Sequence, residues 1–212
     1  MSIYYQDDRV TLHHGDCLEI TDWLDADVLV TDPPYGMNAA LTRTAIDVPI
    51  ANDHDTTIRD RVLDCWGSRP AIVFGHWRKP RPAKVRHLGV WDKVHMALGS
   101  PAAPFATTHE EFYLLGEGDW NPGRRPTVLR FPNLLGSSRP DHPTPKPVGL
   151  MEALIDAAPP GVVGDPFAGS GATLIAARNC GRRAIGVELE ERYCEVIAKR
   201  LSQGVLDFGD LA

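Results

Sequence analysis

The sequence has few cysteines, no cluster of metal ligands and no long hydrophobic run. The four cysteines are scattered without the Cys-x-x-Cys spacing of redox or zinc motifs, so we expect reduced thiols, most of them buried. The eight histidines form no metal-binding pattern, because His109-Glu110-Glu111 lacks the second histidine of a zinc-binding helix, and we expect no metal. No apolar stretch approaches the roughly 20 residues that span a bilayer, and the first residues lack a basic region followed by an apolar one. We therefore expect a cytoplasmic protein with no membrane partner.

Acidic residues are missing from two stretches of a chain whose net charge is -6. The first runs from Gly67 to Trp91 and the second from Trp120 to Pro140. Besides Arg69, they carry nine basic residues: Arg78, Lys79, Arg81, Lys84, Arg86, Arg124, Arg125, Arg130 and Arg139. Clustered cations without acids are typical of surfaces that bind nucleic-acid phosphates. The alternative is a charged, solvated face with no ligand.

Short aliphatic runs alternate with helical patterns along the chain, which is typical of an α/β fold. With 212 residues, the chain is expected to form one domain, residues 1–212. We expect strands near residues 11–13, 28–31, 71–74, 90–93, 112–115, 162–165 and 184–187. Helices are expected from Pro147, from Gly171 and from Glu190. These elements predict a mostly parallel seven-stranded sheet with helices on both faces, and irregular loops within 36–57, 77–87 and 116–141.

A glycine-containing loop, Asp165-Pro166-Phe167-Ala168-Gly169-Ser170-Gly171, follows the aliphatic run 162–164. Glycines at a strand-to-helix turn allow positive φ and let a ligand approach the backbone. The next strand ends at Glu188, about twenty residues later, where an acid can accept hydrogen bonds from both hydroxyls of a ribose. The loop therefore indicates a nucleotide cofactor. Two alternatives stay open: the glycines can form a tight turn without a ligand, and Glu188 can cap the following helix.

A second motif, Asp32-Pro33-Pro34-Tyr35, follows the aliphatic run 28–31. Exocyclic amines of bases are poor nucleophiles because their lone pair is delocalised into the ring. Hydrogen bonds from both amine protons to Asp32 and to the carbonyl of Pro33 would favour a pyramidal, more nucleophilic nitrogen. Tyr35 would stack on the base, which must first leave the duplex to reach such a pocket. The alternative is a polyproline turn with no chemistry.

With both motifs, the sequence resembles the amino-methyltransferases that modify DNA at adenine N6 or cytosine N4 with S-adenosylmethionine. Residues 142–147 resemble the family's segment that contacts the methionine portion of the cofactor. Residues 183–188 resemble the strand that binds its ribose, and residues 15–17 resemble the segment that lies near its adenine. The motif order resembles the circularly permuted beta group, in which residues 11–17 lie beside the carboxyl-terminal half. Two positions depart from the family pattern: Pro145 stands where Gln is usual, and Ala172 where Thr is usual.

The resemblance implies a single-domain, Rossmann-like, S-adenosylmethionine-dependent methyltransferase fold and the following site residues. The catalytic residues would be Asp32, Pro33, Pro34 and Tyr35. The cofactor would be bound by Asp16, Asp32, His142, Thr144, Lys146, Asp165, Phe167, Ala168, Gly169, Ser170, Gly171 and Glu188. Alternatively, Asp16 caps a helix, and His142 and Lys146 are surface residues of a proline-rich loop.

The function implied is site-specific methylation of adenine N6 in a base flipped out of DNA, with S-adenosylhomocysteine as the second product. Adenine is favoured because Asp at position 32 is typical of adenine enzymes. Cytosine N4 is the alternative, and a non-catalytic DNA- or cofactor-binding protein is a further one. Only residues 94–109 stand where relatives carry a long recognition region, so we expect the nine basic residues above to contact DNA. Trp77 and Trp120 stand beside them, where they either pack in the core or fill the gap left by a flipped base. A homodimer and a cognate restriction nuclease are possible partners by family analogy.

Overall fold

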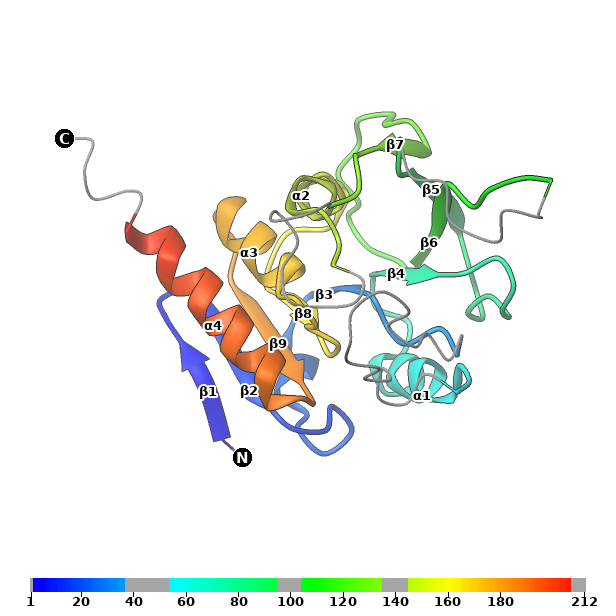
Figure 1. Ribbon diagram of the computed structural model, residues 1–212. Coiled ribbons are helices and arrows are strands. Elements are labelled where there is room, and N and C mark those ends of the chain that lie inside the picture. The colour runs from blue at the N-terminus through cyan, green and yellow to red at the C-terminus, as the bar shows by residue number, and fades with distance from the viewer. Residues whose placement is uncertain (1, 37–53, 95–103, 135–144, 207–212) are drawn as a thin grey trace.

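A computed structural model describes residues 2–36, 54–94, 104–134 and 145–206. Over these residues the chain forms one nine-stranded sheet in the order β1-β2-β9-β8-β3-β4-β6-β5-β7 (Figure 1). The strands are β1 (Ser2–Gln6), β2 (Val10–His14), β3 (Val28–Thr31), β4 (Ala71–Gly75), β5 (His87–Asp92), β6 (His109–Leu115), β7 (Val128–Arg130), β8 (Val163–Asp165) and β9 (Ala184–Glu188). The helices are η1 (Asp22–Asp25, a 3-10 turn), α1 (Thr57–Trp66), α2 (Val148–Ala157), α3 (Ala172–Asn179) and α4 (Glu191–Leu206).

The centre of the sheet is the parallel run β2-β9-β8-β3-β4. β6 pairs antiparallel with β4 and with β5, and β1 pairs antiparallel with β2. The α/β class and all seven expected strands are confirmed, but the count of seven was wrong, because β1 and β7 border the sheet. Each of these two strands pairs with one neighbour only, and β7 is three residues long and largely exposed. Such strands need no continuous apolar run, so composition did not reveal them.

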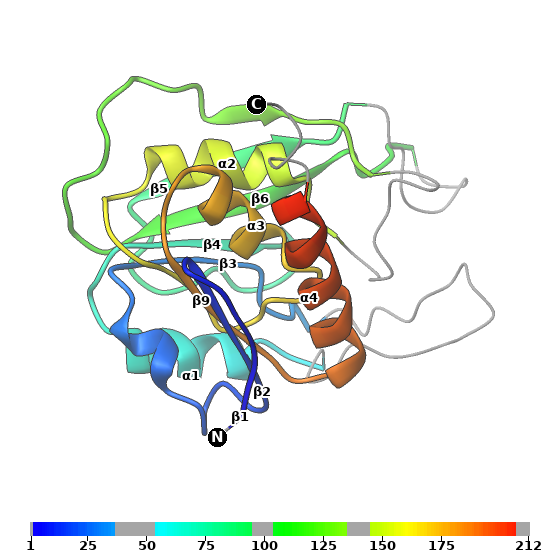
Figure 2. The ribbon, with the colours of Figure 1, turned by 90° about the vertical axis from the view of Figure 1, so that its left-hand side faces the viewer.

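Two apolar layers cover the two faces of the sheet. One contains residues of α2, α3 and α4, including Leu150, Leu174 and Ile197. The other contains residues of η1 and α1, including Trp23 and Trp66, whose rings stack 6.1 Å apart. Figure 2 shows α1 on the opposite side of the sheet from α2 and α3. The expected coverage of both faces is confirmed.

Three helices begin where the sequence predicts, after Pro147, after Gly171 and after Glu190. Helix α1 was not expected. Its buried side chains are those of Arg59, Val62 and Trp66, so its apolar stripe is narrow and includes a charged residue. A helix with so few apolar residues gives a weak sequence signal and is stabilised mainly by tertiary packing.

The thiols are less buried than expected. Cys17 and Cys194 are buried, but Cys65 and Cys180 are exposed, so the expectation that most are buried was wrong. Cys65 lies on the outer face of α1 and Cys180 follows the last residue of α3, positions where neither side chain can reach the core. In the described ranges, no three His, Cys, Asp or Glu side chains are grouped to hold a metal ion. None of the helices described there combines the length and apolar composition needed to cross a bilayer.

Candidate active site

The two sequence motifs meet at the edge of the sheet where β3, β4, β8 and β9 end, which we call the carboxyl edge. β3 and β8 are parallel neighbours, with Val28 opposite Val163. The hydroxyl of Thr31, the last residue of β3, donates a hydrogen bond of 2.7 Å to Asp165 Oδ1 at the end of β8. The parallel pairing therefore brings Asp32, which follows Thr31, beside the glycine loop that follows Asp165. Open α/β sheets bind ligands at this edge.

The glycine loop has the conformation that its sequence predicts. Gly169 and Gly171 have φ values of 51° and 78°, which side chains disfavour. A Cβ atom on Gly171 would lie 3.0 Å from Ile197, so a larger residue would also crowd α4. The Ala168 amide donates to the Val187 carbonyl at 2.9 Å, and the Arg200 guanidinium donates to the Ser170 carbonyl. These contacts fix the loop to β9 and α4, so a ligand here meets a preformed backbone.

Glu188 lies against the glycine loop and is 8% exposed. Its Oε2 accepts a hydrogen bond from the Gly169 amide at 2.8 Å, and its Oε1 accepts one from the Glu190 amide at 2.9 Å. The second contact is the capping role that the sequence left open, since α4 begins one residue later. Burial raises the pKa of Glu188 to about 7. A carboxylate has about four acceptor positions, so two remain for a ligand.

Two further predicted cofactor residues lie at the same edge. Burial raises the pKa of Asp165 to about 6, and its Oδ1 also accepts the Phe167 amide at 3.1 Å. Asp16 lies beside the end of β9, because the Gly15 amide donates to the Glu188 carbonyl at 2.9 Å. The Asp16 carboxylate accepts the Leu18 amide at 2.8 Å, so it caps a turn. The alternative of a helix cap was wrong, because residues 17–19 form a turn and not a helix.

Asp32 is the centre of a buried hydrogen-bond network. Its Oδ1 accepts a hydrogen bond from the Tyr35 hydroxyl, and its Oδ2 accepts one from the Lys146 ammonium. Lys146 Nζ also lies 3.3 Å from the Tyr35 hydroxyl. Burial and Asp32 raise the pKa of Tyr35 well above its usual value, so this hydroxyl stays a donor. The Tyr35 hydroxyl is therefore hydrogen-bonded to Asp32. The sequence predicted only that the Tyr35 ring stacks on the base, and it did not predict this hydrogen bond.

The network continues to two residues that the sequence reasoning missed, Glu110 and Lys93. Glu110 Oε2 lies 3.1 Å from Lys146 Nζ, and Glu110 Oε1 lies 2.5 Å from Lys93 Nζ. Both side chains are nearly buried, with exposed fractions of 12% and 7%. Two carboxylates and two ammonium groups thus alternate in one line and balance in charge.

Protonation follows from these contacts. Burial acts to raise the pKa of Glu110, but Lys146 and Lys93 hold it at about 2. Burial acts to lower the pKa of Lys146, but Asp32 and Glu110 together raise it. Burial raises the pKa of Asp32, and the Lys146 charge opposes that rise. The Lys146 charge therefore favours the carboxylate form of Asp32. Lys146 is not a surface residue of a loop, because its side chain is only 4% exposed.

One signal could have identified the extra pair. Lys93 ends the expected strand 90–93 and Glu110 lies two residues before the expected strand 112–115, so an antiparallel pairing would bring their opposite charges together. The register Asp92 to His109 does this. Of the other predicted site residues, Pro33 is buried, Pro34 is half-buried, and His142, Thr144 and Arg139 lie outside the described residues.

The predicted DNA-binding cations divide between the two edges of the sheet. Arg130 pairs with Asp92 at 3.1 Å, and Arg81 pairs with Glu111 at 3.1 Å, both at the carboxyl edge. By contrast, the Arg86 guanidinium donates to Gly116 O, beyond the end of β6 that lies opposite Ala71. Arg125 pairs with Asp156 near the end of α2, and Arg124 lines the same pocket as Arg125 and Arg86. The length of β4, about 13 Å at roughly 3.3 Å per residue, separates the two groups.

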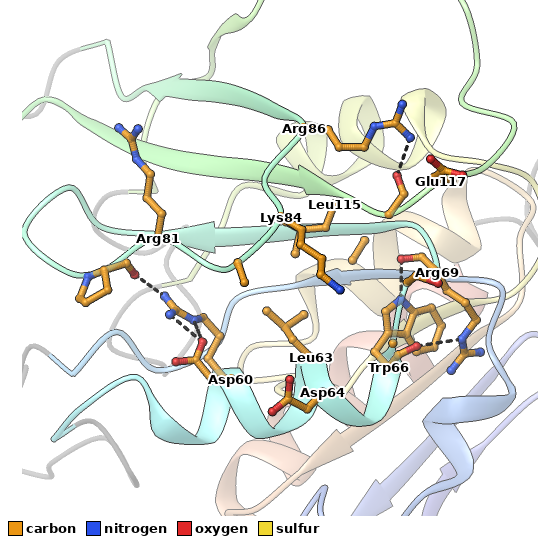
Figure 3. A pocket seen from close by; sticks show the side chains of 17 residues that line it. Asp60, Leu63, Asp64, Trp66, Arg69, Arg81, Lys84, Arg86, Leu115 and Glu117 are labelled. Carbon is orange, nitrogen blue, oxygen red and sulfur yellow. Dashed lines mark hydrogen bonds and ion pairs between the residues drawn. The ribbon is translucent and has the colours of Figure 1, made fainter.

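Some of these basic residues line a large pocket on the α1 face of the sheet. It measures about 820 Å³ and lies between α1, the 80–86 segment and the end of β6. Figure 3 shows Lys84, Arg86 and Arg69 around it, together with Asp60 and Asp64. The mixed charges and the position away from Asp32 separate this pocket from the amine site. Lys84 and Arg86 are therefore not placed to meet a base at Asp32.

Comparisons with known proteins agree with this geometry. A family model described as DNA methylase (N6_N4_Mtase) matches residues 64–200. The type II methyltransferase M.ScaI of Streptomyces caespitosus is 38% identical over 252 aligned positions, covering 93% of this chain and 83% of that protein. The structure of an M1.HpyAVI–SAM complex matches with a TM-score of 0.67 at 23% identity, covering 91% of this chain and 98% of that one.

The cytosine-N4-specific PvuII DNA methyltransferase matches with a TM-score of 0.65 at 16% identity, covering 93% of this chain and 88% of that one. Such distant structural matches establish the α/β methyltransferase fold. The family-model match and the M.ScaI similarity go further: the chain belongs to the N6_N4_Mtase family of DNA methylases.

Proposed function

We propose that this protein transfers a methyl group from S-adenosylmethionine to adenine N6 of a base flipped out of DNA. The observation that carries the proposal is Asp32, paired with the Lys146 ammonium at the junction with the glycine loop. Adenine is preferred to cytosine because Asp at position 32 is typical of adenine enzymes in this family. The PvuII enzyme, whose fold this chain shares, acts on cytosine N4, so cytosine is the competing target.

The residues present fit the cofactor. A small hollow of about 20 Å³ between the motifs is lined by Asp32, Lys146, Met151, Asp165, Ala168, Gly169, Ser170, Ala172 and Thr173. Glu188 would accept hydrogen bonds from the ribose hydroxyls with its remaining lone pairs. Asp165 and Asp32 would complement the positive sulfonium. When bound, S-adenosylmethionine supplies an activated methyl group, and the solved relative M1.HpyAVI forms a complex with it.

The chain's own residues would activate the amine. Asp32 accepts one amine proton in a hydrogen bond, and the Pro33 carbonyl accepts the other, so the nitrogen lone pair turns toward the methyl group. Lys146 and Tyr35 occupy one lone pair on each Asp32 oxygen, and one remains on each for the substrate. Because burial raises its pKa, Asp32 is suited to take up the amine proton after transfer.

DNA would meet the carboxyl edge, where Arg78, Lys79, Arg81 and Arg130 lie. The short connection between β5 and β6 leaves little room for a separate recognition region. A homodimer that covers more DNA, and a cognate restriction nuclease, belong to the same proposal. Light scattering with and without a DNA duplex tests the dimer.

The direct test is mass spectrometry of nucleosides from unmethylated duplex DNA incubated with the protein and S-adenosylmethionine. We expect N6-methyladenine with the wild type and none with Asp32→Ala. Asp32→Asn is the matched control, because it keeps the shape and removes the charge. N4-methylcytosine would change the target base, and no product despite cofactor binding would refute the proposal.

A further inference from the structure

Trp77 differs from the other tryptophans whose burial is described. Trp23, Trp66 and Trp91 are 1%, 2% and 1% exposed, and Trp120 is half-buried against the core. Trp77 is 52% exposed. Core packing therefore accounts for Trp120 but leaves the position of Trp77 unexplained.

Trp77 lies at the carboxyl edge, one strand away from the amine site. β3 and β4 are parallel, with Thr31 opposite Val73. The chain leaves β3 through Asp32 and leaves β4 after Gly75. The segments 32–35 and 76–78 therefore emerge side by side from neighbouring strands, so a base held at Asp32 would bring its duplex close to Trp77.

The ring of Trp77 is held by its sequence neighbours. The His76 ring stacks on it with centroids 5.7 Å apart and planes at 24°. The Arg78 amide donates to His76 Nδ1 at 3.1 Å, which fixes the orientation of the imidazole. Burial and Arg78 lower the pKa of His76, so it supports Trp77 as a neutral, flat ring. A preformed aromatic platform loses little side-chain entropy when it stacks on a base.

A cation lies over this platform. The Arg78 guanidinium lies 4.8 Å from the centre of the Trp77 ring. Within the described ranges, neither Arg78 nor Lys79 forms an ion pair with an acidic residue. An exposed ring with the Arg78 cation on its face complements a stacked base flanked by phosphates.

We propose that Trp77 enters the base stack of duplex DNA at the position that the target base leaves when it rotates toward Asp32. Arg78 then moves from the ring face to a flanking phosphate, and His76 keeps the indole in place. An apolar wedge of this kind compensates for the lost stacking. The inference rests on the proposed function, since it needs a base at Asp32.

The test compares Trp77→Ala with wild type on three DNAs that contain the same target. These are a normal duplex, a duplex with an abasic site opposite the target, and the single strand. We expect kcat/KM on the normal duplex to fall roughly 5- to 150-fold, the range of base–aromatic stacking. On the single strand it should change less than twofold, because there is no duplex stack in which a vacated position has to be filled. On the abasic duplex the loss should persist, because the target base still leaves the stack there. Trp77→Phe should recover part of the loss.

Ile3 provides a control away from this site. Its side chain is 52% exposed, as Trp77 is, and it lies on β1, at the far border of the sheet from β4. Ile3→Ala should leave all three rates unchanged. Equal losses for Trp77→Ala on all three DNAs, no loss at all, or a duplex-specific loss for Ile3→Ala would each overturn the inference. An inactive wild type would instead refute the proposed function.

Discussion

Replacing Lys146 with Met removes the cation that joins the two buried carboxylates, Asp32 and Glu110. Met keeps much of the apolar stem and none of the charge. Without Lys146, the pKa of Asp32 should rise further, because burial and Glu110 both raise it. A protonated Asp32 donates a hydrogen bond instead of accepting one. The variant should therefore lose amine activation at neutral pH.

The structure sets the magnitudes. At 3.1 Å and an effective dielectric constant of about 20, the attraction between Lys146 and Glu110 is about 5 kcal/mol, before the cost of desolvating Lys146. Breaking a buried ion pair by removing one partner typically costs about 3–5 kcal/mol of unfolding free energy. For catalysis we expect a loss of roughly 10²- to 10³-fold in kcat, as for other preorganised polar groups.

The assay is kcat for DNA methylation measured across pH. Activity needs the carboxylate form of Asp32, so the acidic limb of the profile should move to higher pH in Lys146→Met, and raising the pH should recover part of the activity. Lys146→Arg keeps the charge and should retain the wild-type limb.

Two variants separate this effect from misfolding. Asp32→Asn combined with Lys146→Met removes one charge of each sign and leaves the Glu110–Lys93 pair intact, so its stability should recover most of the loss seen with Lys146→Met alone. Lys93→Met removes a cation that contacts Glu110 but not Asp32, and it should destabilise the fold without moving the pH limb as far. A folded Lys146→Met protein with wild-type kcat and an unchanged limb would refute the reasoning.

Three further predictions follow from the same geometry. The pKa of Glu188 is about 7 in the folded protein and 4.5 in the unfolded chain, so between these pH values the folded protein binds one more proton. The free energy of unfolding should therefore fall by roughly 3 kcal/mol as the pH rises from 4.5 to 7. Glu188→Gln should remove this part of the pH dependence, measured by chemical denaturation, and should weaken cofactor binding, measured by calorimetry. The same slope of stability against pH in the variant and the wild type would contradict the prediction. Gly171→Ala places a Cβ at φ 78° and 3.0 Å from Ile197, and should cost about 1–3 kcal/mol, measured by thermal unfolding; an unchanged Tm would count against a preformed loop. Arg78→Ala should weaken DNA binding and reduce the salt slope by about one, whereas the equally exposed Arg124→Ala at the opposite edge should not; equal effects would show that DNA does not approach from the carboxyl edge.

The sequence by itself determined the local features of this protein. The aliphatic runs before Asp32 and Asp165 predicted two strands with polar motifs at their ends, and both are present. Gly171 predicted a turn with positive φ, and Pro147 predicted the start of a helix. Each of these depends on a few adjacent residues, whose backbone preferences act over one turn or one strand.

Only the tertiary structure decided which distant residues share the site. The antiparallel pairing of β5 and β6 brings Lys93 to Glu110, and the approach to α2 places Lys146 between Glu110 and Asp32. Strand direction divides the predicted DNA-binding arginines between two edges, and the register of β3 and β4 places the exposed Trp77 beside the amine site. These outcomes depend on pairing and register between segments far apart in the chain, which no local pattern specifies.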